Sequence, residues 1–227
     1  EMAHLGVDET SRLANLATRG SVNPGDGVLI AGFAVSGPGA KTVLVRGIGP
    51  GLASFGVAGF LANPKLALFD ANGTKVAEND DWGSGNSGAT AVAFAEAGAF
   101  SLVSGSLDAA LVTTVSPGLF TVQLSGERET SGAGLVEVYE FDCKSSRLVN
   151  LSTRLMVSAE AAVGIAGIVV SGPVPKKLLI RGIGPTLSRF GVQDPLADPV
   201  LSIIGPANAI IAVNDNWGAA SNATDIA

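Results

Sequence analysis

Short apolar runs recur along the chain, each only a few residues long and separated from the next by Gly, Pro, Asn or Ser. Several runs are rich in β-branched residues or alternate between apolar and polar positions, as strands of antiparallel sheets do. Helical character is confined to Thr90–Ala97 and the brief Leu52–Phe55. We therefore expect an all-β fold of the antiparallel sandwich or jelly-roll type. The predicted strands are Gly27–Val35, Lys41–Arg46, Leu66–Phe69, Lys75–Glu78, Ala110–Val115, Leu119–Leu124 and Leu135–Glu140.

The pattern repeats after about 135 residues, because the chain aligns with itself at that offset without a gap. Arg12–Arg19 matches Arg147–Arg154, and Arg46–Pro50 matches Arg181–Pro185. Roughly four positions in ten are identical across the overlap, far above chance for two unrelated segments. Positions that are identical in both copies therefore serve the shared fold, or a function that both copies carry.

The repeat divides the chain into three parts. Residues 1–11 are an N-terminal segment or the end of a preceding repeat, and residues 12–146 form the first β-sandwich repeat. Residues 147–227 form a second, incomplete repeat, since Ala227 is the counterpart of Val92. Without the counterparts of three predicted strands, the second copy would expose unpaired edges. Either the chain is an excerpt of a longer repeat protein, which the shortness of residues 1–11 favours, or a neighbouring molecule supplies the strands.

Composition and charge narrow the range of functions. The 227 residues include 30 Gly, only 15% are charged, and the mean hydropathy is +0.41, which suits short strands and tight turns. A net charge of −6 offers no basic surface to nucleic acid or anionic lipid. The longest apolar run, Ala161–Val170, is too short for a membrane span, so we expect no membrane insertion. The single cysteine, Cys143, excludes an intramolecular disulfide and leaves a free thiol or an intermolecular bridge.

One segment imitates a dinucleotide-binding fingerprint. Thr42–Leu52 reads as a strand that runs into a Gly-x-Gly turn, with Asp70 about twenty residues beyond the turn. The third glycine of the fingerprint is replaced by Leu52, however, and Asp70 becomes Gly205 in the second copy. We therefore interpret the segment as a tight Gly-Pro turn after a buried strand, and we expect no organic cofactor.

Two of the charged positions that are identical in both copies stand out by their surroundings. Arg46 and Arg181 end an otherwise apolar strand, and Asp80 and Asp215 each stand close to a tryptophan. An arginine that leaves a buried strand needs a carboxylate or carbonyl partner, because an unpaired buried charge is costly. We therefore predict an Arg46–Asp80 pair and an Arg181–Asp215 pair that stabilise the fold.

The same region offers two candidate ligand sites. Trp82 with Asp81, and Trp217 with Asn216, could stack on a sugar ring and bind its hydroxyls, although a structural role is favoured. The oxygen-rich stretch 79–81 is a candidate calcium site. Its spacing matches no calcium loop of known geometry, and Asp81 becomes Asn216 in the second copy, so a turn is favoured.

Residues for catalysis are scarce. His4 is the only histidine and lies near the N-terminus, so a Ser-His or Cys-His arrangement would depend on a terminal residue. One Cys and one His cannot form a zinc site without several carboxylates. The acids are expected in turns or at outward strand positions, where side chains are solvated, and we expect no enzyme. These acids are Glu78, Glu96, Glu127, Glu129, Glu137 and Glu140.

The motifs Arg-Leu-x-Asn-Leu-x-Thr-Arg, Arg-Gly-Ile-Gly-Pro, Phe-Gly-Val and Asn-Asp-x-Trp occur in both copies. With these motifs the chain resembles an uncharacterised tandem β-sandwich repeat of large secreted bacterial proteins. The stretch Leu66–Glu140 also loosely resembles bacterial pre-peptidase C-terminal domains, through its Leu-Phe-Asp-x-Asn-Gly hairpin and its Ser-Pro-Gly-Leu-Phe-Thr-Val strand entry. Neither resemblance carries catalytic residues. Both imply export, modular β-sandwiches and a role at a surface or in a matrix.

We therefore expect a non-catalytic extracellular structural protein, located outside the cell or at its surface. Its β-sandwich repeats would stack, or add strands to one another, to form a stalk, filament or surface-layer element. The expected partners are further copies of the protein or neighbouring repeats of the same chain. The alternatives are a carbohydrate-binding or adhesion module with a polysaccharide partner, which exposed tryptophans would favour, and an accessory domain of a secreted hydrolase.

Overall fold

A computed structural model describes residues 2–4, 11–84, 87–142, 145–158 and 163–219. The chain forms two compact units. The larger unit is Gly6–Lys176, and the smaller one combines Glu1–Leu5 with Lys177–Ala227. The larger unit therefore contains the first copy of the repeat together with the beginning of the second copy.

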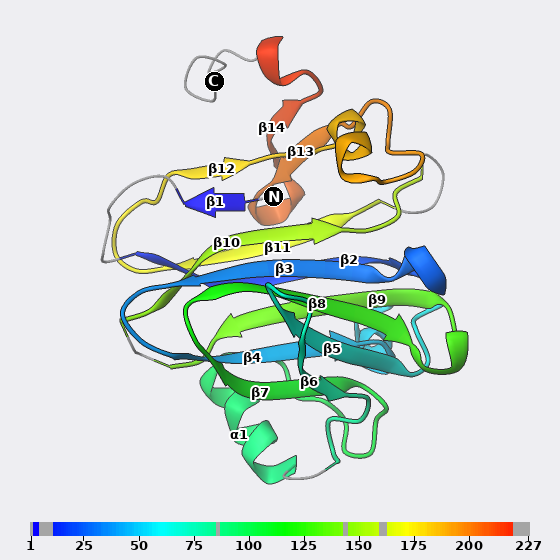
Figure 1. Ribbon diagram of the computed structural model, residues 1–227, viewed down its shortest axis with the longest axis vertical. Helices are drawn as coiled ribbons and strands as arrows, with labels where there is room; N and C mark the ends of the chain where they lie inside the picture. The colour runs from blue at the N-terminus through cyan, green and yellow to red at the C-terminus, as the bar shows by residue number, and fades with distance from the viewer. Residues whose placement is uncertain (1, 5–10, 85–86, 143–144, 159–162, 220–227) are drawn as a thin grey trace. The chain divides into compact units, whose positions relative to one another are not determined.

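Two five-stranded antiparallel sheets form the larger unit, so the predicted all-β sandwich is confirmed (Figure 1). The strand order is β10-β3-β8-β5-β6 in the first sheet and β11-β2-β9-β4-β7 in the second. The strands are β2 (Arg12–Val22), β3 (Leu29–Ser36), β4 (Lys41–Ile48), β5 (Pro64–Asp70), β6 (Lys75–Asn79), β7 (Ala109–Val115), β8 (Gly118–Gly126), β9 (Gly132–Glu140), β10 (Arg147–Arg154) and β11 (Ile165–Ser171).

The predicted helical segments are short, as expected. Thr90–Ala97 corresponds to α1 (Ser87–Glu96), and Leu52–Phe55 lies within the 3-10 helix η2 (Pro50–Phe55). Two further 3-10 turns, η1 (Gly25–Gly27) and η3 (Glu127–Glu129), connect strands. No described helix has the length and apolar character that a membrane span requires.

Strand β4 is buried on both faces, and this places the later site residues. On one face, a Cβ at Gly47 would lie 2.8 Å from side-chain atoms of Leu66 and Leu124 in the other sheet. On the opposite face, Leu44 and Ile48 belong to a second apolar cluster that η2, α1 and the following loop cover. Arg46 lies between Leu44 and Ile48 on the same face of β4, which these elements cover, and its side chain is fully buried.

The smaller unit consists of short elements. Strand β1 (Met2–His4) pairs with β12 (Leu178–Ile180), and β13 (Leu201–Ile204) forms a hairpin with β14 (Ile210–Asn214). The 3-10 turns are η4 (Pro185–Phe190), η5 (Pro206–Asn208) and η6 (Trp217–Ala219). Many large apolar side chains of this unit are exposed, among them Phe190, Ile210, Ile211 and Trp217.

Matching positions of the two copies have the same local backbone geometry. Gly49 and Gly184 precede η2 and η4, and a Cβ at either glycine would lie 2.0 Å from a carbonyl oxygen. Gly56 and Gly191 end these turns in the left-handed region, with φ of 73° and 78°. A side chain is therefore excluded by contact at the first position and disfavoured by backbone strain at the second.

Strand β1 takes a specific register against β12. Met2 lies opposite Ile180, just as Val138 of β9 lies opposite Val45 of β4. Ile180 is the counterpart of Val45 in the second copy. Residues 2–4 thus pair with the second copy as the last strand of the first copy pairs within its own repeat.

Candidate functional site

The two copies of the repeat are joined by strand pairing in both sheets. Strand β10 extends the first sheet beside β3, and β11 extends the second sheet beside β2 (Figure 1). The pairing is reciprocal, because β10 is the counterpart of β2 and β11 is the counterpart of β3. The same edge of each copy therefore meets itself, and we call this contact the joint.

Each residue pair in the β2–β11 ladder has an equivalent pair in the β3–β10 ladder, in which both residues are replaced by their counterparts in the other copy. Arg19 lies opposite Ile165, and their counterparts Arg154 and Ile30 also lie opposite each other. The same holds for every other pair that the two ladders contain. Both ladders also carry a bulge at the same position of the repeat. This correspondence is that of a self-complementary interface around an approximate two-fold axis.

Equivalent residues meet at the centre of the joint. The hydroxyl groups of Thr18 and Thr153 share a 2.8 Å hydrogen bond across the two sheets, and the residues are 135 positions apart. The Thr18 side chain is 1% exposed, so water does not compete for this contact. A residue meets its own counterpart only on a two-fold axis, so this bond marks that axis.

A pair of serine contacts closes the joint at its ends. The Ser11 hydroxyl donates to the carbonyl oxygen of Val174 (2.6 Å), and the Ser146 hydroxyl donates to that of Gly39 (2.5 Å). The backbone N–H groups of Val174 and Gly39 donate back to the same hydroxyls, at 3.2 and 3.0 Å. Ser11 and Ser146 are counterparts, as are Gly39 and Val174, so these contacts obey the same symmetry.

Arg46 has a different partner from the one that the sequence predicted. Its Nε and Nη2 donate to Oε2 of Glu137, at 2.8 and 2.6 Å, and its Nη1 donates to the carbonyl oxygen of Phe100. The predicted Arg46–Asp80 pair is therefore wrong, and Asp80 lies half-buried just after β6. Glu137 stands opposite Arg46 on β9, so strand register brings the charges together.

Aromatic rings surround this buried ion pair. The guanidinium carbon of Arg46 lies 4.2 Å from the ring centre of Phe100 and 4.9 Å from that of Phe94, where cation–π attraction adds to the ion pair. The Tyr139 hydroxyl donates to Oε1 of Glu137 at 2.9 Å. Burial, together with the Glu137 carboxylate, raises the pKa of Tyr139. The expected solvated position of Glu137 is also wrong, since the side chain is buried.

A second buried ion-pair cluster lies at the other end of the same strands. Lys41 is fully buried, and its Nζ lies 2.9 Å from both Glu140 Oε1 and Asp142 Oδ1. Arg12 Nε lies 2.9 Å from Glu140 Oε2. Glu140 was expected on a solvated face, but its side chain is only 1% exposed. Burial of these charges is tolerated because each of them has an opposite charge beside it.

The Gly-rich turn that imitates a nucleotide site already holds an anion, the side chain of Asp108. Gly49 N–H donates to Asp108 Oδ1 at 2.8 Å, and Gly51 N–H donates to both oxygens at 3.1 Å. Ser106 donates a further hydrogen bond to Asp108 Oδ2 at 2.8 Å. The donors that would bind phosphate in a nucleotide site are thus occupied within the fold.

The two tryptophans differ in exposure. Trp82 is 7% exposed, packs against Phe94 and donates from Nε1 to the Ser106 hydroxyl at 3.2 Å. Trp217 is 63% exposed. The predicted sugar-stacking face is therefore covered at Trp82, because its ring is part of the apolar cluster beneath α1.

The Asn79–Asp81 stretch is a structural turn. The Asn79 side chain accepts from the N–H of Ala110 (2.9 Å) and donates to the carbonyl of Asp81 (3.0 Å), which fixes the end of β6 to β7. In the second copy, Asn214 donates to the carbonyl of Asn216 in the same way. Among the described residues, no group of three acidic, His or Cys side chains is placed to hold a metal ion.

Several predicted residues are not brought into a site. Arg181 and Asp215 directly follow β12 and β14 and are both exposed, so their predicted pairing stays a prediction. The backbone of His4 belongs to β1. Cys143 lies outside the described residues.

Comparison with known proteins adds no assignment. No protein-family model matches the chain, and no similar chain was found among curated proteins or solved structures.

Proposed function

We propose that this chain is a non-catalytic, extracellular structural repeat protein whose β-sandwiches join in pairs by reciprocal strand addition. The observation that carries the proposal is the register of the joint, in which β2 and β3 of one copy pair with β11 and β10 of the next. Strand addition satisfies backbone hydrogen bonds that a free sheet edge would expose, and it ties the first strands of the second repeat, β10 and β11, to the first repeat. A stalk, filament or surface layer needs joints of this kind.

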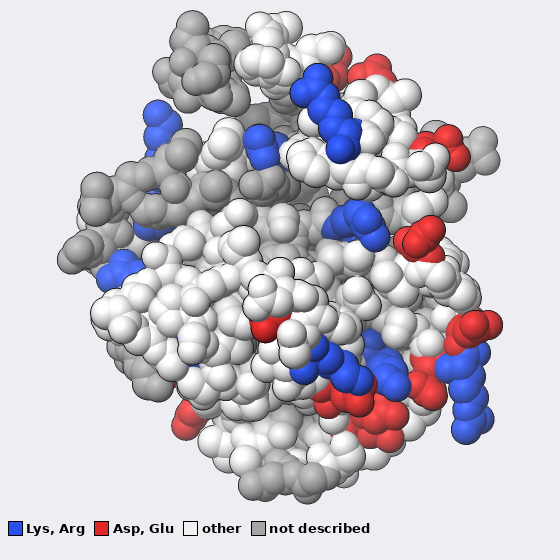
Figure 2. All heavy atoms as spheres, in the orientation of Figure 1, with Lys and Arg blue, Asp and Glu red and all other residues white. Residues whose placement is uncertain are grey.

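The far edges of the first sandwich support pairing rather than unlimited edge addition. Strand β6 ends one sheet and carries the exposed ion pair of Lys75 and Glu78, at 2.8 Å. Strand β7 ends the other sheet, and α1 packs beside it. Charged side chains gather in the region of β5 and β6, whereas much of the visible surface is uncharged (Figure 2). Charged and covered edges resist further strand addition, so a pair of repeats is the natural building block.

The buried charges also favour a structural role. Glu137 and Glu140 are held by buried cations, and Asp108 is held by backbone N–H groups of the Gly-rich turn. Acids used in that way stabilise the fold and are not offered to a substrate. The sugar-binding alternative has less support, because the ring of Trp82 is covered.

Electron microscopy of the full-length native protein tests the proposal. We expect elongated particles or layers in which sandwich-sized domains recur in pairs, and labelling with antibody should place them at the outside of intact cells. Compact particles without a repeating unit, or antigen found only inside the cell, would overturn it.

A further inference from the structure

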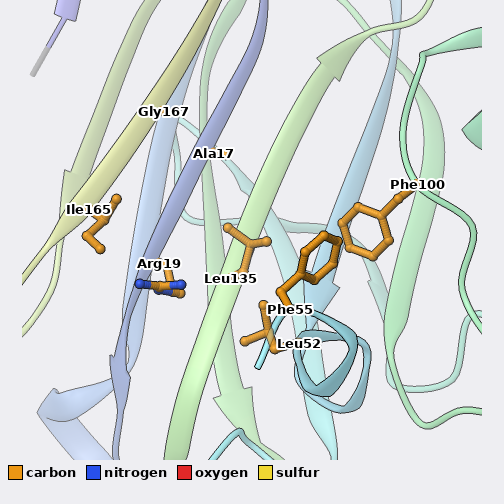
Figure 3. A pocket seen from close by; sticks show the side chains of 8 residues that line it. All are labelled: Ala17, Arg19, Leu52, Phe55, Phe100, Leu135, Ile165 and Gly167. Atoms are coloured by element: carbon orange, nitrogen blue, oxygen red, sulfur yellow. The ribbon is translucent and has the colours of Figure 1, made fainter. Parts of the chain in front are cut away.

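An open apolar groove crosses the joint on the outer face of the second sheet. Its volume is about 370 Å³, and its walls come from both copies (Figure 3). One side of the groove is formed by Leu52 and Phe55 of η2, by Phe100 of the loop after α1, and by Leu135 of β9. The other side is formed by Arg19 of β2 and Ile165 of β11. Because Ile165 belongs to the second copy, the joint supplies part of the groove's wall.

The apolar side of the groove is unusually exposed. The Phe55 ring is 60% exposed and meets the Phe100 ring edge to face, with 5.0 Å between the centres. Ile165, on the opposite wall, is 47% exposed. An aromatic pair in an open groove gains contact area when an apolar group covers it.

Among the described residues that line the groove, Arg19 carries the only charge. Its side chain is half-buried, and none of the described residues provides it with a carboxylate or a hydrogen-bond acceptor. The other strand arginines of the first copy, Arg12 and Arg46, each have an acidic partner. A guanidinium that is partly removed from water and lacks a counter-charge attracts an anion, and its planar fork matches a carboxylate.

Comparison of the copies points to the same residues. Arg19 and Phe55 are retained as Arg154 and Phe190, although only roughly four positions in ten are identical between the copies. Phe55 is 60% exposed even with Phe100 beside it, so burial does not explain why a large ring is kept at this position. Retention of an exposed ring together with an arginine fits a shared binding role.

We propose that the groove binds an organic carboxylate with an apolar aliphatic or aromatic body. The carboxylate pairs with the Arg19 guanidinium, and the apolar body lies over Leu135 and Leu52 toward the rings of Phe55 and Phe100. A sugar fits poorly, because the side chains of the lining offer a single polar group and most sugar hydroxyls would lose their hydrogen bonds. The inference goes beyond the structural role and does not depend on it.

Isothermal titration of the whole chain with decanoate, below its micellar concentration, tests the inference. We expect saturable binding of decanoate, and no binding of acetate, which lacks the apolar body, or of decanol, which lacks the charge. Arg19→Met and Phe55→Ser should each weaken decanoate binding at least about tenfold. The matched variant Arg154→Met should bind as the parent does, because Arg154 is exposed and does not line the groove.

Three outcomes would overturn the inference. These are no decanoate binding by the parent, equal binding by decanol, or unchanged binding by Arg19→Met. Stronger binding of glucuronate than of decanoate would assign the groove to acidic sugars instead. Circular dichroism of each variant separates loss of binding from loss of fold.

Discussion

Thr18 and Thr153 occupy the same position in the two copies of the repeat, and their hydroxyl groups share a 2.8 Å hydrogen bond. The bond joins the second sheet, through β2, to the first sheet, through β10. Around it, β2 of the first copy pairs with β11, the counterpart of β3, and β3 pairs with β10, the counterpart of β2. The pairing edge of the repeat is therefore self-complementary, in the way that the interface of a symmetric dimer is.

Removal of either hydroxyl at the joint should destabilise the larger unit. We expect Thr18→Val and Thr153→Val each to lower the free energy of unfolding by about 1 kcal/mol, because each removes this hydrogen bond and leaves the other hydroxyl without its partner. The double variant should cost clearly less than the sum, because both polar groups are then gone. Urea denaturation of the parent, the two single variants and the double variant measures these free energies. The exposed pair Thr42 and Thr114, at 3.0 Å, is the matched control and should show little coupling.

Breaking the buried ion pair of the first copy should cost more. Arg46→Met leaves Glu137 buried and uncompensated, so we expect a loss of about 3–5 kcal/mol in the free energy of unfolding. Lys75→Met removes an exposed ion pair with Glu78 and should change it by less than about 1 kcal/mol. Equal effects of the two substitutions in chemical denaturation would contradict the burial of Arg46.

Tyr139 should make the free energy of unfolding fall at alkaline pH. Burial, followed by the nearby Glu137 carboxylate, raises its pKa above the ordinary value of 10.0. Because the folded pKa is the higher one, this stabilisation is complete below about pH 10 and is lost above it, by up to about 1.4 kcal/mol per pH unit. Tyr139 is the only tyrosine, so tyrosinate absorbance reports on it alone. We expect less tyrosinate absorbance from the folded protein than from the unfolded protein at about pH 11. Ordinary titration near pH 10 in the folded protein would refute this.

Asp108 should stabilise the turn that begins η2. Asp108→Ala removes the acceptor of the Gly49 and Gly51 N–H groups, and we expect a loss of about 2–4 kcal/mol in the free energy of unfolding. Asp26 lies exposed in η1, so Asp26→Ala is the control and should have little effect. Thermal denaturation measures both, and an unchanged melting temperature for Asp108→Ala would show that the turn does not need its anion.

The sequence predicts most strands correctly because alternation survives wherever one face of a strand is buried. It misses β2 and β10, in which a bulge at Ala14 and at Val149 interrupts the alternation. Leu13 and Leu16 are both buried as a result, three residues apart, which is a helical spacing. The alignment of the two copies finds these segments as a motif, but it does not show that they form the joint.

The partner of Arg46 could not be found from the sequence for a different reason. Glu137 is 91 residues away, and alternation places it on the outer face of β9, where solvent is the ordinary neighbour. Here the outer face is covered by a second apolar cluster that includes Phe94 and Leu102. Burial on both faces of a sheet depends on how loops and α1 fold back, and that information is not in the local pattern.

An engineered disulfide at the two-fold axis tests the joint most directly. In a Cys143→Ser background, Thr18→Cys combined with Thr153→Cys places two thiols where the hydroxyl groups are in hydrogen-bond contact. We expect an intramolecular disulfide under mild oxidation, seen as a monomer with faster migration on non-reducing gels and a mass lower by two hydrogens. Free thiols in the folded monomer, or only disulfide-linked dimers, would show that the two copies do not meet at this axis.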